Sequence, residues 1–391
     1  MDFYNSELNA LKRNKILRKR KVYCEFGAES CEKGRESKKP LADFASNDYL
    51  GLSNRADSLR KAYKLTTNPA LSAPRASMLV NGYSKLHRRL ERRLANLNGF
   101  ESCILAGSGF LANIALIESL VRKGDKIFID EEYHASGILA SRLVQGVEFF
   151  RHNDCADLKK KILSSLQGKS QDLHESTKKT RILIAIEGIY SMSGDIAPKG
   201  FAQIAQKYNA ILIVDEAHSS GTLGQNLLGY FDYHHIKIAP IFIKLGTFSK
   251  ALGSYGAYIC CSSHIHSYLQ TRAKPIIYST ALSAFDSALA LTNLNFIHQN
   301  RARFARKIAK IKKNIQKNLK IKLDSQIFSI QFQSQNGMLK TFRFLKKHGI
   351  LVGAIRKPSV KIPQLRIILS TKHKKKDIIR LCKLLKKQWS K

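Results

Sequence analysis

The sequence predicts an α/β protein with a mainly parallel, seven-stranded β-sheet sandwiched by helices, and a smaller α+β domain toward the C-terminus. From Leu41 onward, short apolar stretches alternate with segments of helical apolar spacing, a pattern typical of a parallel sheet. The stretch 181–187 is almost entirely Ile, Leu and Ala, as expected of a strand that is covered on both faces. Most of the predicted strands run directly into polar turns, where ligands bind in such sheets.

The elements of the larger domain are predicted in order along the chain. Strands are expected at 103–106, 126–130, 147–150, 181–187, 210–215, 241–245 and 256–261, and helices at 109–121, 156–166 and 199–208. The segment 167–180 is expected to be a polar loop. Residues 1–21 have the spacing of a basic amphipathic helix, so we expect a helical arm over 1–45 ahead of a catalytic domain over 46–290.

The C-terminal domain is expected over 291–391. A long helix predicted over 284–317 leads into it, followed by strands near 329–332, 351–353 and 365–369 and helices at 338–348 and 375–388.

Composition and cysteine usage limit the classes of protein. No tract approaches the roughly 18 apolar residues of a membrane span, and the N-terminus lacks the apolar core of a secretory signal. We therefore expect a cytoplasmic protein with no membrane partner. The seven cysteines include no C-x-x-C pair, so no metal site is expected.

The high positive charge suggests an alternative function, the binding of nucleic acid. Lys and Arg number 67 against 29 Asp and Glu, a formal net charge of +38, which would favour a polyanion such as nucleic acid. The dense runs at 307–322 and 372–376 lack the interleaved aromatics of a base-stacking surface. Solvated helix faces are the simpler interpretation, and no nucleic-acid partner is expected.

Four polar turns hold reactive groups at strand ends, at 107–110, 131–134, 215–218 and 246–250. An enzyme that uses pyridoxal 5′-phosphate (PLP) needs an amine, a carboxylate for the pyridine nitrogen, donors for the phosphate and a flat group against the ring. Lys250, Asp215, the amides of 108–110 at a helix start and His134 can supply them.

Seven stretches, in this order, resemble the α-oxoamine synthases. They are 46–52 (SNDYLGL), 108–110 with Asn113, 134–136 (HAS), 187–195 (EGIYSMSGD), 215–221 (DEAHSSG), 247–250 (TFSK) and 278–280 (YST). Enzymes of this family have fold type I, use PLP and condense an amino acid with an acyl thioester, releasing CO₂. The resemblance also implies a homodimer with sites at the interface.

The resemblance assigns roles to individual residues. It gives Lys250 the imine bond to PLP and proton transfer, Asp215 the pyridine nitrogen, and His134 the ring stack. Near the phenolic oxygen it places His218 and Ser191. The phosphate is assigned to Ser108, Gly109, Phe110 and Thr247, with Thr280 from a second subunit, and the substrate to Asn47, Arg366 and the arm residue Arg20.

Within the family, 354–360 (AIRKPSV) and 365–367 (LRI) are most similar to the member that condenses L-alanine with a pimeloyl thioester of coenzyme A or acyl carrier protein, in biotin biosynthesis. A sister enzyme of the glycine C-acetyltransferase, 5-aminolevulinate synthase or serine palmitoyltransferase type is the alternative. A catalytically inactive subunit is another, although such subunits typically lack the lysine found here at 250. The loop 73–82 departs from the glycine-rich pattern of relatives, which leaves the acyl specificity open.

Overall fold

The chain forms two compact units in a computed structural model that describes residues 1–14, 16–20, 23, 41–67, 73–167 and 180–389. The larger unit comprises 47–191 and 195–308, and the smaller comprises 1–46, 192–194 and 309–391. Within the described ranges, no helix has both the length and the apolar character needed to cross a bilayer. The predicted loop 167–180 lies almost wholly outside the described residues.

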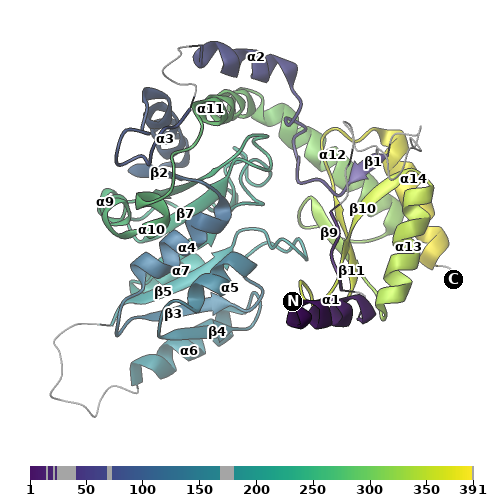
Figure 1. Ribbon diagram of the computed structural model, residues 1–391, viewed down its shortest axis with the longest axis horizontal. Helices are drawn as coiled ribbons and strands as arrows, with labels where there is room; N and C mark the ends of the chain where they lie inside the picture. Colours follow the sequence, from purple (N-terminus) through teal and green to yellow (C-terminus); the bar gives the residue numbers. More distant parts are fainter. Residues whose placement is uncertain (15, 21–22, 24–40, 68–72, 168–179, 390–391) are drawn as a thin grey trace. The chain divides into compact units, whose positions relative to one another are not determined.

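The larger unit contains a seven-stranded sheet with the strand order β2-β8-β7-β6-β5-β3-β4 (Figure 1). Its strands are β2 (Ser102–Ala106), β3 (Lys126–Asp130), β4 (Val147–Phe150), β5 (Ile182–Glu187), β6 (Ile211–Asp215), β7 (Phe242–Thr247) and β8 (Ala257–Cys261). The strands from β7 to β4 are mutually parallel, and β8 is antiparallel to both β2 and β7. The predicted mainly parallel sheet is confirmed, and all its strands except β8 end at the same edge.

Helices pack around this sheet and at its β2 end. They are α2 (Ala56–Leu65), α3 (Lys85–Asn98), α4 (Gly109–Leu120), α5 (Ala135–Ser141), α6 (Cys155–Gln167), α7 (Gly200–Tyr208), α8 (Tyr230–Tyr233), α9 (Ser263–Arg272), α10 (Lys274–Ile277) and α11 (Ala284–Gln299). Helix α11 packs against α2 and α3 (Figure 1). Helix α4 contacts β7 and β8, and α7 contacts β6.

Both faces of the sheet are buried, as the apolar strand sequences require. Ile213 and Ile243 share a core cluster with Leu116 of α4. Successive side chains of a strand point to opposite faces, so Phe242 faces away from this cluster. It is fully buried against Phe231, with the ring centroids 5.3 Å apart.

The smaller unit contains a four-stranded sheet of order β1-β10-β11-β9. The strands are β1 (Ala42–Phe44), β9 (Ile327–Gln331), β10 (Ile350–Ile355) and β11 (Gln364–Ile368), and the helices are α1 (Asp2–Arg13), α12 (Arg301–Leu319), α13 (Gln335–Lys347) and α14 (Lys375–Trp389). Strand β1 runs parallel to β10, and β10, β11 and β9 are antiparallel. Helix α12 begins in the larger unit and continues into the smaller one.

Two predicted helices were wrong in their extent. The helix expected over 1–21 ends at Arg13, because the carbonyl of Leu11 accepts the N–H groups of Ile16 and Leu17 at 3.0 and 3.1 Å, which turns the chain out of the helix. The single helix expected over 284–317 is broken at Asn300 into α11 and α12. The Asn300 amide donates to the carbonyl of Phe296 at 2.9 Å, and such side-chain bonds compete with regular helix bonding.

Candidate active site

A lysine and a histidine meet beyond the carboxyl ends of β6 and β7. Nζ of Lys250, three residues after β7, lies 2.9 Å from Nε2 of His218, three residues after β6. The other ring nitrogen of His218, Nδ1, lies 2.6 Å from the hydroxyl of Tyr49. Tyr49 and His218 are both buried, so Lys250 contacts a histidine that is packed inside the larger unit.

Asp215, the last residue of β6, is held by donors on both carboxylate oxygens. Oδ1 accepts the backbone N–H of Ala217 at 2.9 Å, and Oδ2 accepts the side-chain amide of Asn113 at 2.8 Å. The side chain is 5% exposed. Two N–H donors hold the carboxylate in a fixed orientation, which suits a partner for a protonated pyridine nitrogen.

A second carboxyl group lies next to Asp215. Glu187 ends β5 and pairs in register with Asp215 on β6. Burial, and then the charge of Asp215, raise the pKa of Glu187 well above its ordinary value. Its Oε2 accepts the backbone N–H of Ser191 at 3.0 Å, whereas Oε1 has no hydrogen-bond partner among the described residues. Burial and the neighbouring Asp215 therefore favour the protonated form of Glu187.

The N-terminus of α4 forms a place for an anion. Ser108 caps the helix by accepting the N–H of Leu111 at 3.2 Å, and Gly109 and Phe110 open it. A Cβ atom added to Gly109 would lie 3.9 Å from Cβ of Thr247, so the end of β7 faces this helix start. Unpaired N–H groups and the helix dipole favour a phosphate there.

His134 precedes α5 and is half-buried. Its Nδ1 lies 2.7 Å from Oγ of Ser136 and accepts the backbone N–H of the same residue at 3.2 Å. Burial lowers the pKa of His134, the Asp215 carboxylate raises it and the Lys250 ammonium lowers it, with a net downward shift. An uncharged imidazole is thus favoured near neutral pH.

Five predicted site residues remain to be placed. Ser191 follows β5 and is 8% exposed, whereas Thr280 is exposed and forms an isolated bridge with Ser77. Asn47 belongs to the larger unit. Arg366, buried on β11, and the exposed Arg20 belong to the smaller unit. The assignment of these residues to the cofactor or substrate rests on the resemblance alone.

Sequence reasoning gave no role to four residues that the structure brings into this network: Tyr49, Asn113, Ser136 and Glu187. Each occurs in a stretch that carries the family resemblance. Their position in those stretches was the available signal, since nothing in the residue types distinguishes them from packing residues.

Comparisons with known proteins identify relatives along nearly the whole chain. The model of the family "Aminotransferase class I and II" matches residues 39–385. An 8-amino-7-oxononanoate synthase of Helicobacter pylori is 43% identical over 98% of this chain and 96% of that relative. One of Maricaulis maris is 33% identical over 98% of this chain and 95% of that relative.

Solved structures share the fold. A serine palmitoyltransferase of Sphingomonas wittichii superposes with a TM-score of 0.85 at 22% identity, over 100% of this chain and 97% of that chain. An 8-amino-7-oxononanoate synthase of Francisella tularensis superposes with a TM-score of 0.68 at 27% identity, over 90% of this chain and 98% of that chain. The chain therefore belongs to the class I and II aminotransferase family and to the family of the 8-amino-7-oxononanoate synthases.

Proposed function

We propose that this chain binds PLP on Lys250 and condenses L-alanine with a pimeloyl thioester, forming 8-amino-7-oxononanoate, CO₂ and the free thiol. The names of its relatives support this choice of reaction. The observation that carries the proposal is the 2.9 Å contact between Nζ of Lys250 and Nε2 of His218. It provides an amine at the ligand-binding edge of the sheet, next to a group that can exchange a proton with it.

The residues near Lys250 fit PLP. Asp215 is a carboxylate whose oxygens are held by two N–H donors, which suits a partner for a pyridinium. The start of α4 and Thr247 face one another and offer donors for a phosphate. His134 supplies a flat, neutral ring. A serine palmitoyltransferase with this fold has been solved with bound PLP.

The side chains divide the chemistry among them. When bound, PLP supplies an electron sink for the α-carbon of the amino acid. Lys250 removes the α-proton of alanine and returns a proton to the same carbon after CO₂ has left. His218 holds Nζ by a hydrogen bond, and Asp215 balances the charge of the pyridinium. His134, uncharged with Nδ1 occupied by Ser136, has its remaining N–H available to polarise the thioester carbonyl.

The proposal also includes the oligomeric state of the protein and the carrier of the acyl group. The chain is proposed to act in the cytoplasm as a homodimer in which Thr280 reaches the site of the partner. The net charge of +38 would attract an acidic carrier protein or the phosphates of coenzyme A. A Michaelis constant for the thioester that rises steeply with salt would support this attraction.

The test is chemical labelling of the purified protein. We expect visible absorption from bound PLP, and reduction with borohydride should fix the cofactor on the peptide that contains Lys250, as read by mass spectrometry. The Lys250→Ala variant should lose the borohydride-fixed label, whereas Lys274→Ala, which changes an exposed lysine, should keep both the absorption and the label. Label on a different lysine, or none, would refute the proposal.

The substrate is tested separately. L-Alanine with pimeloyl-CoA or a pimeloyl carrier protein should give 8-amino-7-oxononanoate. Product from glycine with acetyl-CoA or succinyl-CoA, or from serine with palmitoyl-CoA, would instead assign the chain to a sister activity while keeping the role of Lys250.

A further inference from the structure

The side-chain amide of Asn113, on α4, joins two parts of the proposed cofactor site. Its Nδ2 donates to Oδ2 of Asp215 at 2.8 Å and to Oγ of Ser136 at 3.0 Å, and its Oδ1 accepts the hydroxyl of Tyr133 at 2.7 Å. We propose that Asn113 is a positioning residue that fixes the carboxylate of Asp215 and, through Ser136, the ring of His134. This inference rests on the proposed function.

The orientation of the Asn113 amide is determined by its partners. An ionised carboxylate only accepts hydrogen bonds, so the atom facing Asp215 must be the NH₂ group. The carbonyl oxygen then faces Tyr133, whose hydroxyl donates. Burial, followed by the charge of Asp215, raises the pKa of Tyr133 far above its ordinary value, so this donor keeps its proton. A flipped amide would place two acceptors against each other at Asp215.

The network also fixes the proton position on His134. Oγ of Ser136 accepts a hydrogen from Asn113, so its own hydrogen is free to go to Nδ1 of His134, 2.7 Å away. The backbone N–H of Ser136 points to the same Nδ1 at 3.2 Å. With two donors directed at it, Nδ1 carries no hydrogen, and the neutral ring bears its hydrogen on Nε2.

A second buried asparagine shows how far this arrangement differs from ordinary packing. Asn293, on α11, is fully buried and donates to the carbonyl of Leu252 at 2.7 Å. Its Oδ1 has no hydrogen-bond partner among the residues that the structure covers. Asn113, 1% exposed, instead uses both amide hydrogens and its oxygen. Because one amide bonds three side chains, it fixes the orientation of each of these three side chains.

The experiment compares Asn113→Ala, Ser136→Ala and the control Asn293→Ala. Cofactor affinity is measured by titrating PLP into apoprotein and following visible absorption. The titration of His134 is followed by NMR of the ring Cε1–H in apoprotein, with the signal assigned by its absence in His134→Asn. We expect Asn113→Ala to weaken PLP binding about tenfold, because Asp215 loses a charge-assisted bond, and Asn293→Ala to leave the affinity unchanged.

The two network variants should differ in a defined way. Donors to Nδ1 stabilise only the unprotonated ring, so Ser136→Ala should raise the pKa of His134. Asn113→Ala should raise the pKa of His134 by a smaller amount, because the Ser136 hydroxyl is still present but has lost its hydrogen bond from Asn113. A purely structural role would lower the unfolding temperature of all three variants and move neither readout.

Unchanged PLP affinity and His134 titration in Asn113→Ala would overturn the inference. If that variant does not fold, Ser136→Ala decides, and an unchanged His134 titration in it would have the same consequence. A wild-type protein that takes up no PLP would refute the proposed function instead, while the His134 titration in apoprotein would still test the network.

Discussion

Nε2 of His218 lies 2.9 Å from Nζ of Lys250, and Nδ1 of the same ring lies 2.6 Å from the hydroxyl of Tyr49. An ammonium group only donates hydrogen bonds, so a charged Lys250 makes Nε2 the acceptor. The ring hydrogen is then on Nδ1 and is donated to the oxygen of Tyr49. Tyr49 thereby sets the tautomer in which His218 can accept from the lysine.

The Tyr49→Phe variant removes this acceptor and leaves the Nδ1–H of His218 with one partner fewer in a buried place. We expect kcat/KM to fall by about tenfold, the effect of losing one hydrogen bond of about 1.4 kcal/mol. The matched control is Tyr230→Phe, which removes a buried hydroxyl that donates to the carbonyl of Pro198 at 3.0 Å. Steady-state kinetics of both variants check the prediction, and an equal loss in the control would contradict it.

Most of the larger unit could be predicted from the sequence because its strands are covered on both faces. The strands at 126–130 and 147–150 have the predicted bounds, and the family and fold are confirmed by the comparisons. The helices α2, α3, α5, α8, α9 and α10 were not predicted. For α8 and α10 the reason is length, since four residues are too few to show a helical period. The break at Asn300 depends on a side-chain bond that apolar spacing does not reveal.

The candidate site could be predicted only in part. The turns after strands gave Lys250, Asp215 and His134, because parallel strands end at one edge. The contact between Tyr49 and His218 joins positions that are 169 residues apart, and no local pattern specifies it. The raised pKa of Glu187 likewise follows from its burial and from its register with Asp215, both of which depend on the strand order.

His152 forms a charged cluster at the same edge of the sheet. Its Nδ1 lies 3.1 Å from Oδ1 of the buried Asp130, and its Nε2 lies 3.2 Å from Oδ2 of Asp195, with Glu132 at 3.9 Å. The ring of Tyr190 packs edge-on against it. Burial lowers the pKa of His152, but the hydrogen bonds to Asp130 and Asp195 raise it by a larger amount, so that the pKa is about 10.

The sign of the stability effect follows from this shift. The pKa in the folded state lies above the ordinary value of 6.5, so the stabilisation is fully present below 6.5 and is lost as the pH rises through about 10. The His152→Gln variant should lose roughly 2–3 kcal/mol of unfolding free energy at mildly acidic pH, the size of a charged hydrogen bond. The difference from wild type should shrink toward pH 10, as measured by urea unfolding at several pH values.

A control with the opposite shift is available in His234. Burial lowers the pKa of His234, whose Nε2 lies 2.8 Å from the carbonyl oxygen of Ala197. A bond to the neutral ring contributes stability that is lost as the pH falls. The His234→Gln variant should therefore retain the wild-type loss of stability at high pH. A difference between wild type and His152→Gln that does not change with pH would show that His152 is uncharged in the folded protein.

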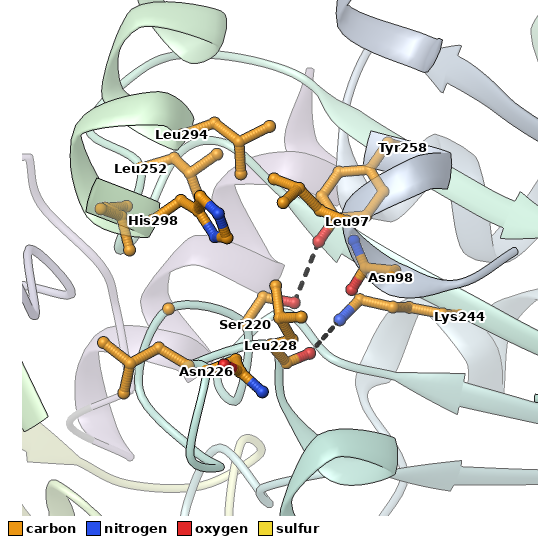
Figure 2. Close-up of a pocket in the computed structure, with 13 residues that line it drawn as sticks. Leu97, Asn98, Ser220, Asn226, Leu228, Lys244, Leu252, Tyr258, Leu294 and His298 are labelled. Atoms are coloured by element: carbon orange, nitrogen blue, oxygen red, sulfur yellow. Dashed lines mark hydrogen bonds between the residues drawn. The ribbon is translucent and has the colours of Figure 1, made fainter. Parts of the chain in front are cut away.

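A buried ion pair joins β7 to Glu216, the residue that follows Asp215. Lys244, on β7 and 1% exposed, donates to the carbonyl of Leu228, as Figure 2 shows, and its Nζ lies 3.7 Å from Oε1 of Glu216. The other oxygen of Glu216 accepts from Ser219 Oγ at 2.5 Å and from the N–H of Tyr230 at 2.6 Å. The pair thus ties β7 to the segment that follows β6.

Replacing only Lys244 should destabilise the protein, because the buried carboxylate of Glu216 then has no cation beside it. Burial raises the pKa of Glu216, and Lys244 acts in the opposite direction. The Lys244→Met variant should therefore lose roughly 3–5 kcal/mol of unfolding free energy and should gain stability as the pH falls and Glu216 takes up a proton. The double variant Lys244→Met with Glu216→Gln removes both charges and should recover most of this loss. Urea unfolding at two pH values compares the single and double variants with the wild type. Equal losses that do not change with pH would contradict the prediction. They would show that the cost comes from the packing of the methionine side chain and not from an unpaired carboxylate.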